Sequence, residues 1–174
     1  YKVKDIIFAN GSKELLFMLQ TVFEGVVILV SPYWVSYMEH SKILNKKTEI
    51  IETSYEEGYK LTPEKLENVC NKYKDQPKLL IFNSPNNPTG VVYSNNELAY
   101  LSKIINKHNI IILSDEIYNK LNFNNMSSSS ISYYCPKKTI RCTSLSKIIG
   151  TGGWRCGWCT FPEELNYIFQ KMRI

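Results

Sequence analysis

The segment Lys78-Leu-Leu-Ile-Phe-Asn-Ser-Pro-Asn-Asn-Pro-Thr-Gly90 decides the fold of this chain. It begins as an apolar strand, Lys78–Phe82, and ends in a loop rich in Pro, Asn and Gly. Ser94-Asn-Asn-Glu97 is a capping box that starts an amphipathic helix, and Asn109-Ile-Ile-Ile-Leu113 is the next apolar strand. Because both strands are continuously apolar and a helix joins them, they are predicted to be parallel neighbours in a sheet covered on both faces.

The same alternation of strands and helices extends along the rest of the chain. The predicted helices begin at Gly11-Ser-Lys13, at Thr62-Pro63 (running to about Lys72) and at Pro162, and the predicted strands are Val26–Val30, Lys47–Thr53, Thr139–Thr143 and Trp154–Phe161. The serine-rich tract Asn122–Ser130 is predicted to be a surface loop. The sequence therefore predicts an α/β fold with a mostly parallel central sheet and helices on both faces.

Composition excludes several classes of protein. The chain has 174 residues, of which 44% are hydrophobic and 21% charged, so it can form one globular domain with a sizeable core. No apolar run approaches the roughly 18 residues that cross a membrane, and no membrane association is expected. The net charge of +5 comes from lysines without clustered arginines and interleaved aromatics, so no nucleic-acid partner is expected.

The five cysteines suggest free thiols in a reducing compartment, because their number is odd and their spacing fits no disulfide framework. The expected location is cytoplasmic, or organellar if an upstream presequence was removed. Cys156-Gly-Trp-Cys159 has redox spacing but lies in a predicted strand, whereas a redox pair needs a helix N-terminus. A zinc site would need two more ligands, and His40 and His108 are isolated, so no metal is expected.

Polar clusters follow the predicted strands or open the predicted helices. In parallel sheets, ligands bind at the carboxyl ends of the strands, where these clusters would lie. Read alone, Gly11-Ser-Lys13 is an ordinary helix start, Asn86-Asn-Pro-Thr-Gly90 a turn and Lys147 a surface lysine. Asp115 differs, because a carboxylate at the end of an apolar strand needs a partner.

Taken together, the clusters form an ordered set of motifs. Asn86-Asn-Pro-Thr-Gly90, Ser114-Asp-Glu-Ile-Tyr118, Ser144-Leu-Ser-Lys147 and Gly153-Trp-Arg155 follow one another along the chain. In this order and spacing the sequence resembles the class I/II pyridoxal-phosphate aminotransferases of fold type I. With Ser31-Pro-Tyr-Trp-Val-Ser-Tyr37 included, it looks closest to the bacterial and plant-type aspartate/prephenate aminotransferases.

The resemblance implies a pyridoxal 5′-phosphate site with specific roles for its residues. Lys147 matches the family's Schiff-base lysine, which also shuttles the proton, and Asp115 matches the aspartate that pairs with the pyridine nitrogen. Asn87 and Tyr118 match the pair that hydrogen-bonds the phenolic oxygen of the ring. Trp34 matches the aromatic residue stacked on the cofactor, with core packing as the alternative.

The resemblance also implies how the phosphate is held. Arg155 and Ser144 would contact it through their side chains, and Arg can meet two phosphate oxygens at once. Gly11, Ser12 and Lys13 would contribute backbone N–H groups at the start of a helix.

The resemblance implies that residues 1–174 correspond to the large, cofactor-binding domain of this family. The N-terminal segment and the small domain, which carries the arginine that clamps the substrate carboxylate, have no counterpart here. The leading expectation is a fragment of a longer protein, and a naturally short protein is the alternative. Either would hold the cofactor but transaminate poorly or not at all. The implied partners are an amino acid and a 2-oxo acid, with a homodimer for the intact protein.

Several functions remain open at this point. The first hypothesis is transamination of aspartate or a similar amino acid. The second is a related activity that would share these motifs, namely an aromatic aminotransferase, a carbon–sulfur lyase or a cyclopropane-forming synthase. A non-catalytic relative is the alternative from another class, although intact Lys147, Asp115, Tyr118 and Arg155 argue against it. A thiol-redox domain is the most distant possibility.

Overall fold

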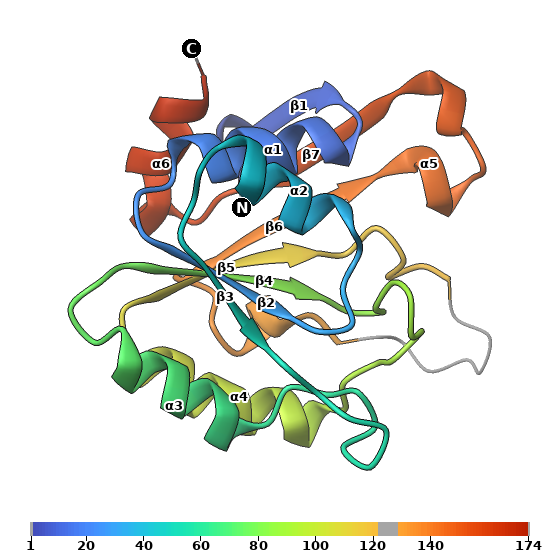
Figure 1. The fold of residues 1–174 in the computed structure, drawn as a ribbon. Helices are drawn as coiled ribbons and strands as arrows, with labels where there is room; N and C mark the ends of the chain where they lie inside the picture. Colours follow the sequence, from blue (N-terminus) through green and yellow to red (C-terminus); the bar gives the residue numbers. More distant parts are fainter. Residues whose placement is uncertain (1, 122–128, 174) are drawn as a thin grey trace.

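The computed structural model describes residues 2–121 and 129–173. Within these ranges seven strands form one sheet in the order β1-β7-β6-β5-β4-β2-β3 (Figure 1). The strands are β1 (Ile6–Asn10), β2 (Val26–Val30), β3 (Thr48–Ile51), β4 (Lys78–Asn83), β5 (Ile110–Asp115), β6 (Thr139–Ser144) and β7 (Cys156–Thr160). Of the predicted loop Asn122–Ser130, residues 122–128 lie outside the described ranges.

Most of the sheet is parallel, as the sequence predicts. The neighbours β3, β2, β4, β5 and β6 run parallel, whereas β7 is antiparallel to both β6 and β1. The register pairs Asn83 with Asp115 and Ser144 with Gly157. The carboxyl ends of β4, β5 and β6 therefore meet at one edge of the sheet.

Helices lie on both faces of the sheet (Figure 1). They are α1 (Ser12–Val22), α2 (Ser36–Ile43), α3 (Pro63–Lys72), α4 (Asn95–Lys107), α5 (Leu145–Ile148) and α6 (Asn166–Met172). Helices α1, α2 and α6 pack on one face, and α3 and α4 on the other. Each layer encloses its own apolar cluster, so the predicted α/β fold is confirmed.

The elements with strong local signals form where the sequence predicts them. Thr62 caps α3 by accepting a hydrogen bond from the Lys65 backbone N–H, and Pro63 occupies the first helical position. Ser94 and Glu97 form the predicted capping box of α4. These caps satisfy backbone donors that would otherwise be unpaired at a helix start.

Other elements differ from the prediction. Strand β3 covers only Thr48–Ile51, and α6 begins at Asn166 after a 3₁₀ turn instead of at Pro162. Strand β1 and helix α2 were not predicted. Helix α2 has no side-chain cap and carries Glu39, His40 and Lys42, so its apolar periodicity is weak.

Cys156 and Cys159 lie in strand β7, as predicted, and not at the helix N-terminus that a redox pair needs. Residues three apart on a strand point to opposite faces, so the two thiols cannot face each other. Cys159 is buried opposite Cys142 of β6, while Cys156 is only half-buried. This geometry removes the redox interpretation of the motif.

Candidate active site

Asp115 lies at the carboxyl end of β5 and is 3% exposed. The Tyr37 hydroxyl donates to its Oδ2 at 2.7 Å, and the Ile117 backbone N–H donates to its Oδ1 at 3.2 Å. Asn83 of β4 donates from Nδ2 to the Asp115 carbonyl oxygen at 2.9 Å. Both the side chain and the backbone of Asp115 are thus held in place by neighbouring elements.

Burial raises the pKa of Asp115 to about 6, because the carboxylate is withdrawn from water. The hydrogen bonds from Tyr37 and Ile117 lower that pKa, and the nearby charge of Glu116 raises it. Among the described residues Asp115 forms no ion pair, whereas Glu116 pairs with Arg141 at 2.8 Å. The site therefore presents a buried carboxyl group that would be stabilised as the anion by a cationic ligand.

Asn87 and Tyr118, which the resemblance assigns to one ligand atom, lie together. Asn87 donates from Nδ2 to the Tyr118 hydroxyl oxygen at 3.4 Å. The Asn87 backbone N–H donates to Asn83 Oδ1 at 2.7 Å, so Asn83 connects this loop to Asp115. Both side chains are half-buried and retain polar atoms that can serve a ligand.

The N-terminus of α1 lies against β7 in very close contact. A Cβ atom at Gly157 would lie 2.4 Å from the Ser12 backbone nitrogen and 2.5 Å from the Gly11 carbonyl carbon, so only glycine fits there. A Cβ atom at Gly11 would lie 2.4 Å from Arg155 Nη2. The guanidinium group and the first backbone N–H groups of the helix are therefore adjacent, an arrangement that suits an anion.

Arg155 is exposed and is held by backbone carbonyl groups. Its Nη1 donates to Gly152 and its Nη2 to Asn10, each at 3.0 Å. Arg155 has a φ of 52°, a left-handed conformation that is uncommon for a residue with a side chain. This backbone geometry places the guanidinium over Gly11.

Ser144 and Lys147 lie at the junction of β6 and α5. Ser144 is fully buried, and its Oγ accepts from the Ser146 backbone N–H at 3.1 Å, which caps α5. Lys147 lies on this four-residue helix with an exposed side chain, and it makes no hydrogen bond or ion pair within the described ranges. The structure thus leaves its amine accessible and unengaged by those residues.

Trp34 and Lys13 contact each other. Lys13 Nζ lies 4.9 Å from the centroid of the Trp34 ring, and Trp34 meets Tyr37 edge-on at 5.5 Å with an interplanar angle of 90°. Trp34 is half-buried, so it packs against the core and also presents ring surface. Both the predicted stacking role and its core-packing alternative suit this position.

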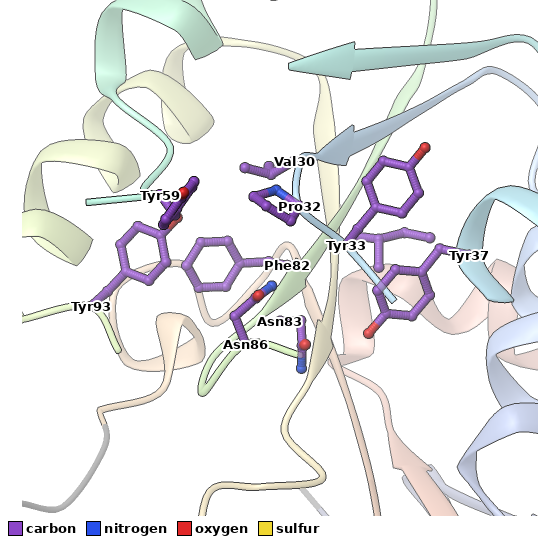
Figure 2. Close-up of a pocket in the computed structure, with 10 residues that line it drawn as sticks. Val30, Pro32, Tyr33, Tyr37, Tyr59, Phe82, Asn83, Asn86 and Tyr93 are labelled. Carbon is purple, nitrogen blue, oxygen red and sulfur yellow. The ribbon is translucent and has the colours of Figure 1, made fainter. Parts of the chain in front are cut away.

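Sequence reasoning missed Tyr37 as a site residue, although it quoted the stretch that contains it. Tyr37 borders a cavity of about 20 Å³ at the ends of β2 and β4, which is large enough for a single water molecule (Figure 2). Asn83 and Gly157 were missed as well. A polar residue directly after an apolar strand is a signal for Asn83, but the close approach at Gly157 depends on tertiary structure.

The described residues contain neither a metal-binding cluster nor a helix that could span a membrane. Across residues 2–121 and 129–173, no three His, Cys, Asp or Glu side chains are grouped so that they could bind a metal ion. In the same ranges, none of the helices combines the length and apolarity that a membrane span requires.

The chain matches the model of one protein family and is similar to members of that family. The family model "Aminotransferase class I and II" matches residues 1–173. An aspartate aminotransferase from Bacillus sp. (strain YM-2) is 42% identical over 171 residues, covering 95% of this chain and 43% of that protein. An aspartate/prephenate aminotransferase from Cereibacter sphaeroides is 33% identical over 172 residues, covering 95% and 42% respectively.

Among solved structures, an aspartate aminotransferase from Rhizobium meliloti superposes with a TM-score of 0.90 at 26% identity. The match covers 99% of this chain and 43% of that one. The chain thus spans less than half the length of the relatives that it matches.

Proposed function

The chain belongs to the class I and II aminotransferase family, and we propose that it forms the pyridoxal-phosphate-binding large domain of an enzyme that transfers an amino group between aspartate, or a similar amino acid, and a 2-oxo acid. The names of its relatives support aspartate as the donor. The observation that carries the proposal is the buried Asp115 carboxyl group at the sheet edge, held by Tyr37 and Ile117 without a cationic partner among the described residues.

The residues at this edge fit pyridoxal phosphate. Asp115 offers a carboxylate to a protonated ring nitrogen, and the half-buried Asn87 and Tyr118 offer polar atoms to the phenolic oxygen. The α1 N-terminus, where the Arg155 guanidinium group lies against Gly11, offers backbone and guanidinium donors to a phosphate. These groups match the charge and polarity of the three ends of the cofactor.

When bound, pyridoxal phosphate supplies an aldehyde that reacts with amines and a ring that withdraws electrons from the substrate Cα. In our proposal Lys147 provides the amine of the resting enzyme and afterwards moves a proton to and from the substrate Cα. Asp115 holds a proton at the ring nitrogen, which keeps the ring electron-withdrawing. Trp34 restricts the ring to one plane, and Arg155 with Ser144 anchors the phosphate.

The test is an absorbance spectrum of the purified chain after addition of pyridoxal phosphate and removal of the excess, beside a Lys147→Ala control. We expect a visible band that requires Lys147 and that declines when aspartate is added. Phenylalanine and a β-thio amino acid, added in parallel, distinguish an aromatic aminotransferase and a carbon–sulfur lyase. A band of equal strength in both proteins, or in neither, would contradict the proposed cofactor site in this chain.

The homodimer of the intact protein and the cytoplasmic location stay predictions. Transamination by this chain alone also stays a prediction.

A further inference from the structure

Tyr37 lies far from Asp115 in sequence and adjoins it in space. Its side chain is 2% exposed, and its hydroxyl donates to Asp115 Oδ2 at 2.7 Å. We propose that Tyr37 is a positioning residue of this site, whose hydroxyl holds the Asp115 carboxyl group in the orientation and ionised form that can pair with a cationic ring nitrogen. The proposal rests on the proposed function and assigns to α2 a part in tuning the cofactor.

The Tyr37 ring is fixed by its surroundings. Trp34 packs edge-on against it at 5.5 Å, and the Tyr37 backbone N–H donates to the Trp34 carbonyl oxygen at 3.0 Å. Figure 2 shows the Tyr37 hydroxyl pointing inward toward Asn83, whereas the hydroxyl of neighbouring Tyr33 points away from both. A rigid ring delivers its hydroxyl to one place, so the hydrogen bond restricts the Asp115 side chain to one orientation.

The direction of this hydrogen bond is set by charge. Burial and the nearby Asp115 carboxylate raise the pKa of Tyr37 well above its ordinary value, so the phenol keeps its proton and acts as donor. Its donation favours the ionised form of Asp115 and opposes the effect of burial. Without that donor one carboxylate oxygen would lose a buried partner, and Asp115 would bind a proton more readily.

Among the groups that face Asp115 and Tyr37, Tyr37 is a principal influence on the pKa of Asp115. From β5 and the segment after it, Glu116 raises the pKa of Asp115, although Glu116 is itself paired with Arg141. From β6, the Cys142 thiol has a pKa raised well above its ordinary value by its contact with Cys159 and by burial, so it stays neutral. Tyr118 also raises the pKa of Tyr37, so it too favours the protonated phenol.

The experiment compares Tyr37→Phe with Tyr33→Phe, a matched removal of a hydroxyl beside the same cavity. In the chain without cofactor, carboxyl ¹³C NMR follows the titration of Asp115. We expect Tyr37→Phe to raise the Asp115 pKa by about 1 unit above its value near 6, and Tyr33→Phe to leave it unchanged. Equal titration in both variants and the parent chain would overturn the proposal.

A second measurement separates positioning from simple structural support. Pyridoxal phosphate affinity of Tyr37→Phe is expected to fall about 5-fold at pH 6, where the higher Asp115 pKa leaves much less carboxylate, and to recover toward the parent value at pH 8.5, where Asp115 is ionised in both proteins. A structural role would weaken binding equally at both pH values. Such a pH-independent loss counts against the proposal.

The experiments test the role of Tyr37 separately from the proposed function. If the parent chain gives no Lys147-dependent band, the cofactor proposal fails, while the NMR titration still decides whether Tyr37 controls Asp115. If Tyr37→Phe does not fold, the parent chain itself is tested through the Tyr37 Cζ resonance, which should shift with the same midpoint as the Asp115 carboxyl carbon. Independent midpoints would overturn the inference.

Discussion

The candidate site has two parts that are built differently. The strand-end part comprises Asp115, Asn87 and Tyr118, which side chains from β4 and α2 hold in a buried or half-buried network. The loop part comprises Lys147 and Arg155, which are exposed and lie on short elements around α5 and the following 3₁₀ turn.

The difference shows where this fold supplies rigidity. Parallel strands fix their carboxyl ends by main-chain hydrogen bonds, so side chains there can be pre-arranged for tuning a ligand's electronic state. Groups that approach an anion or supply an amine lie on exposed segments and make fewer side-chain contacts. The strand-end part should therefore dominate stability and its pH dependence, and the loop part should dominate affinity for the phosphate.

Gly157→Ala should have the largest effect, because it acts where α1 meets β7. The added Cβ would lie 2.4 Å from the Ser12 backbone nitrogen, so the helix must shift. We expect a loss of about 3 kcal/mol in the free energy of unfolding, measured with urea, together with loss of phosphate binding. Gly152→Ala is the control, since no described heavy atom lies within 4 Å of its added Cβ. Equal stability of the two variants would contradict the close contact.

Asp115→Asn should stabilise the chain without cofactor and abolish its tight binding of pyridoxal phosphate. The folded pKa of Asp115, about 6, exceeds its unfolded value of about 3.9. Folding therefore disfavours the carboxylate, and stability from this group declines as pH rises from about 4 to 6 and stays low above that range.

Replacement by the neutral amide is expected to add about 3 kcal/mol to the free energy of unfolding at pH 8 and little at pH 4. Urea unfolding of both proteins at the two pH values measures this difference. A gain of the same size at pH 4 would show that the effect has another origin than the charge.

Arg155→Lys should mainly affect affinity. Lysine keeps the charge but loses the planar fork that meets two phosphate oxygens, so we expect about tenfold weaker binding of pyridoxal phosphate. Binding of pyridoxal, which lacks the phosphate, should be unchanged, and the two titrations together locate the effect. Equal losses for both compounds would place Arg155 outside the phosphate site.

Lys13→Ala should have the smallest effect. The contact between Lys13 Nζ and the Trp34 ring is exposed, and its loss is expected to lower the free energy of unfolding by about 0.5 kcal/mol. The pKa of His40, which burial and the Lys13 charge lower, should rise in this variant. Proton NMR of His40 follows the titration, and an unchanged midpoint would show that the charge of Lys13 does not reach it.

Much of the fold is predictable because its signals are local. The caps at Thr62 and Ser94 and the apolar runs of β2, β4 and β5 require only neighbouring residues to be recognised. Strand β1 and helix α2 escape such reasoning. Pairing with β7 determines β1, and packing beside α1 determines α2, so the deciding contacts lie far away in sequence.

The sequence by itself determined the family, the α/β class and the identity of the polar residues at the strand ends, because these depend on residue type, order and spacing. The tertiary structure decided which of these residues touch. It brought Tyr37 to Asp115 and Gly157 to the start of α1, contacts that sequence spacing does not encode. The physical reason is that a strand's register and a helix's approach are fixed by long-range packing, whereas caps and apolar periods are fixed within a few residues.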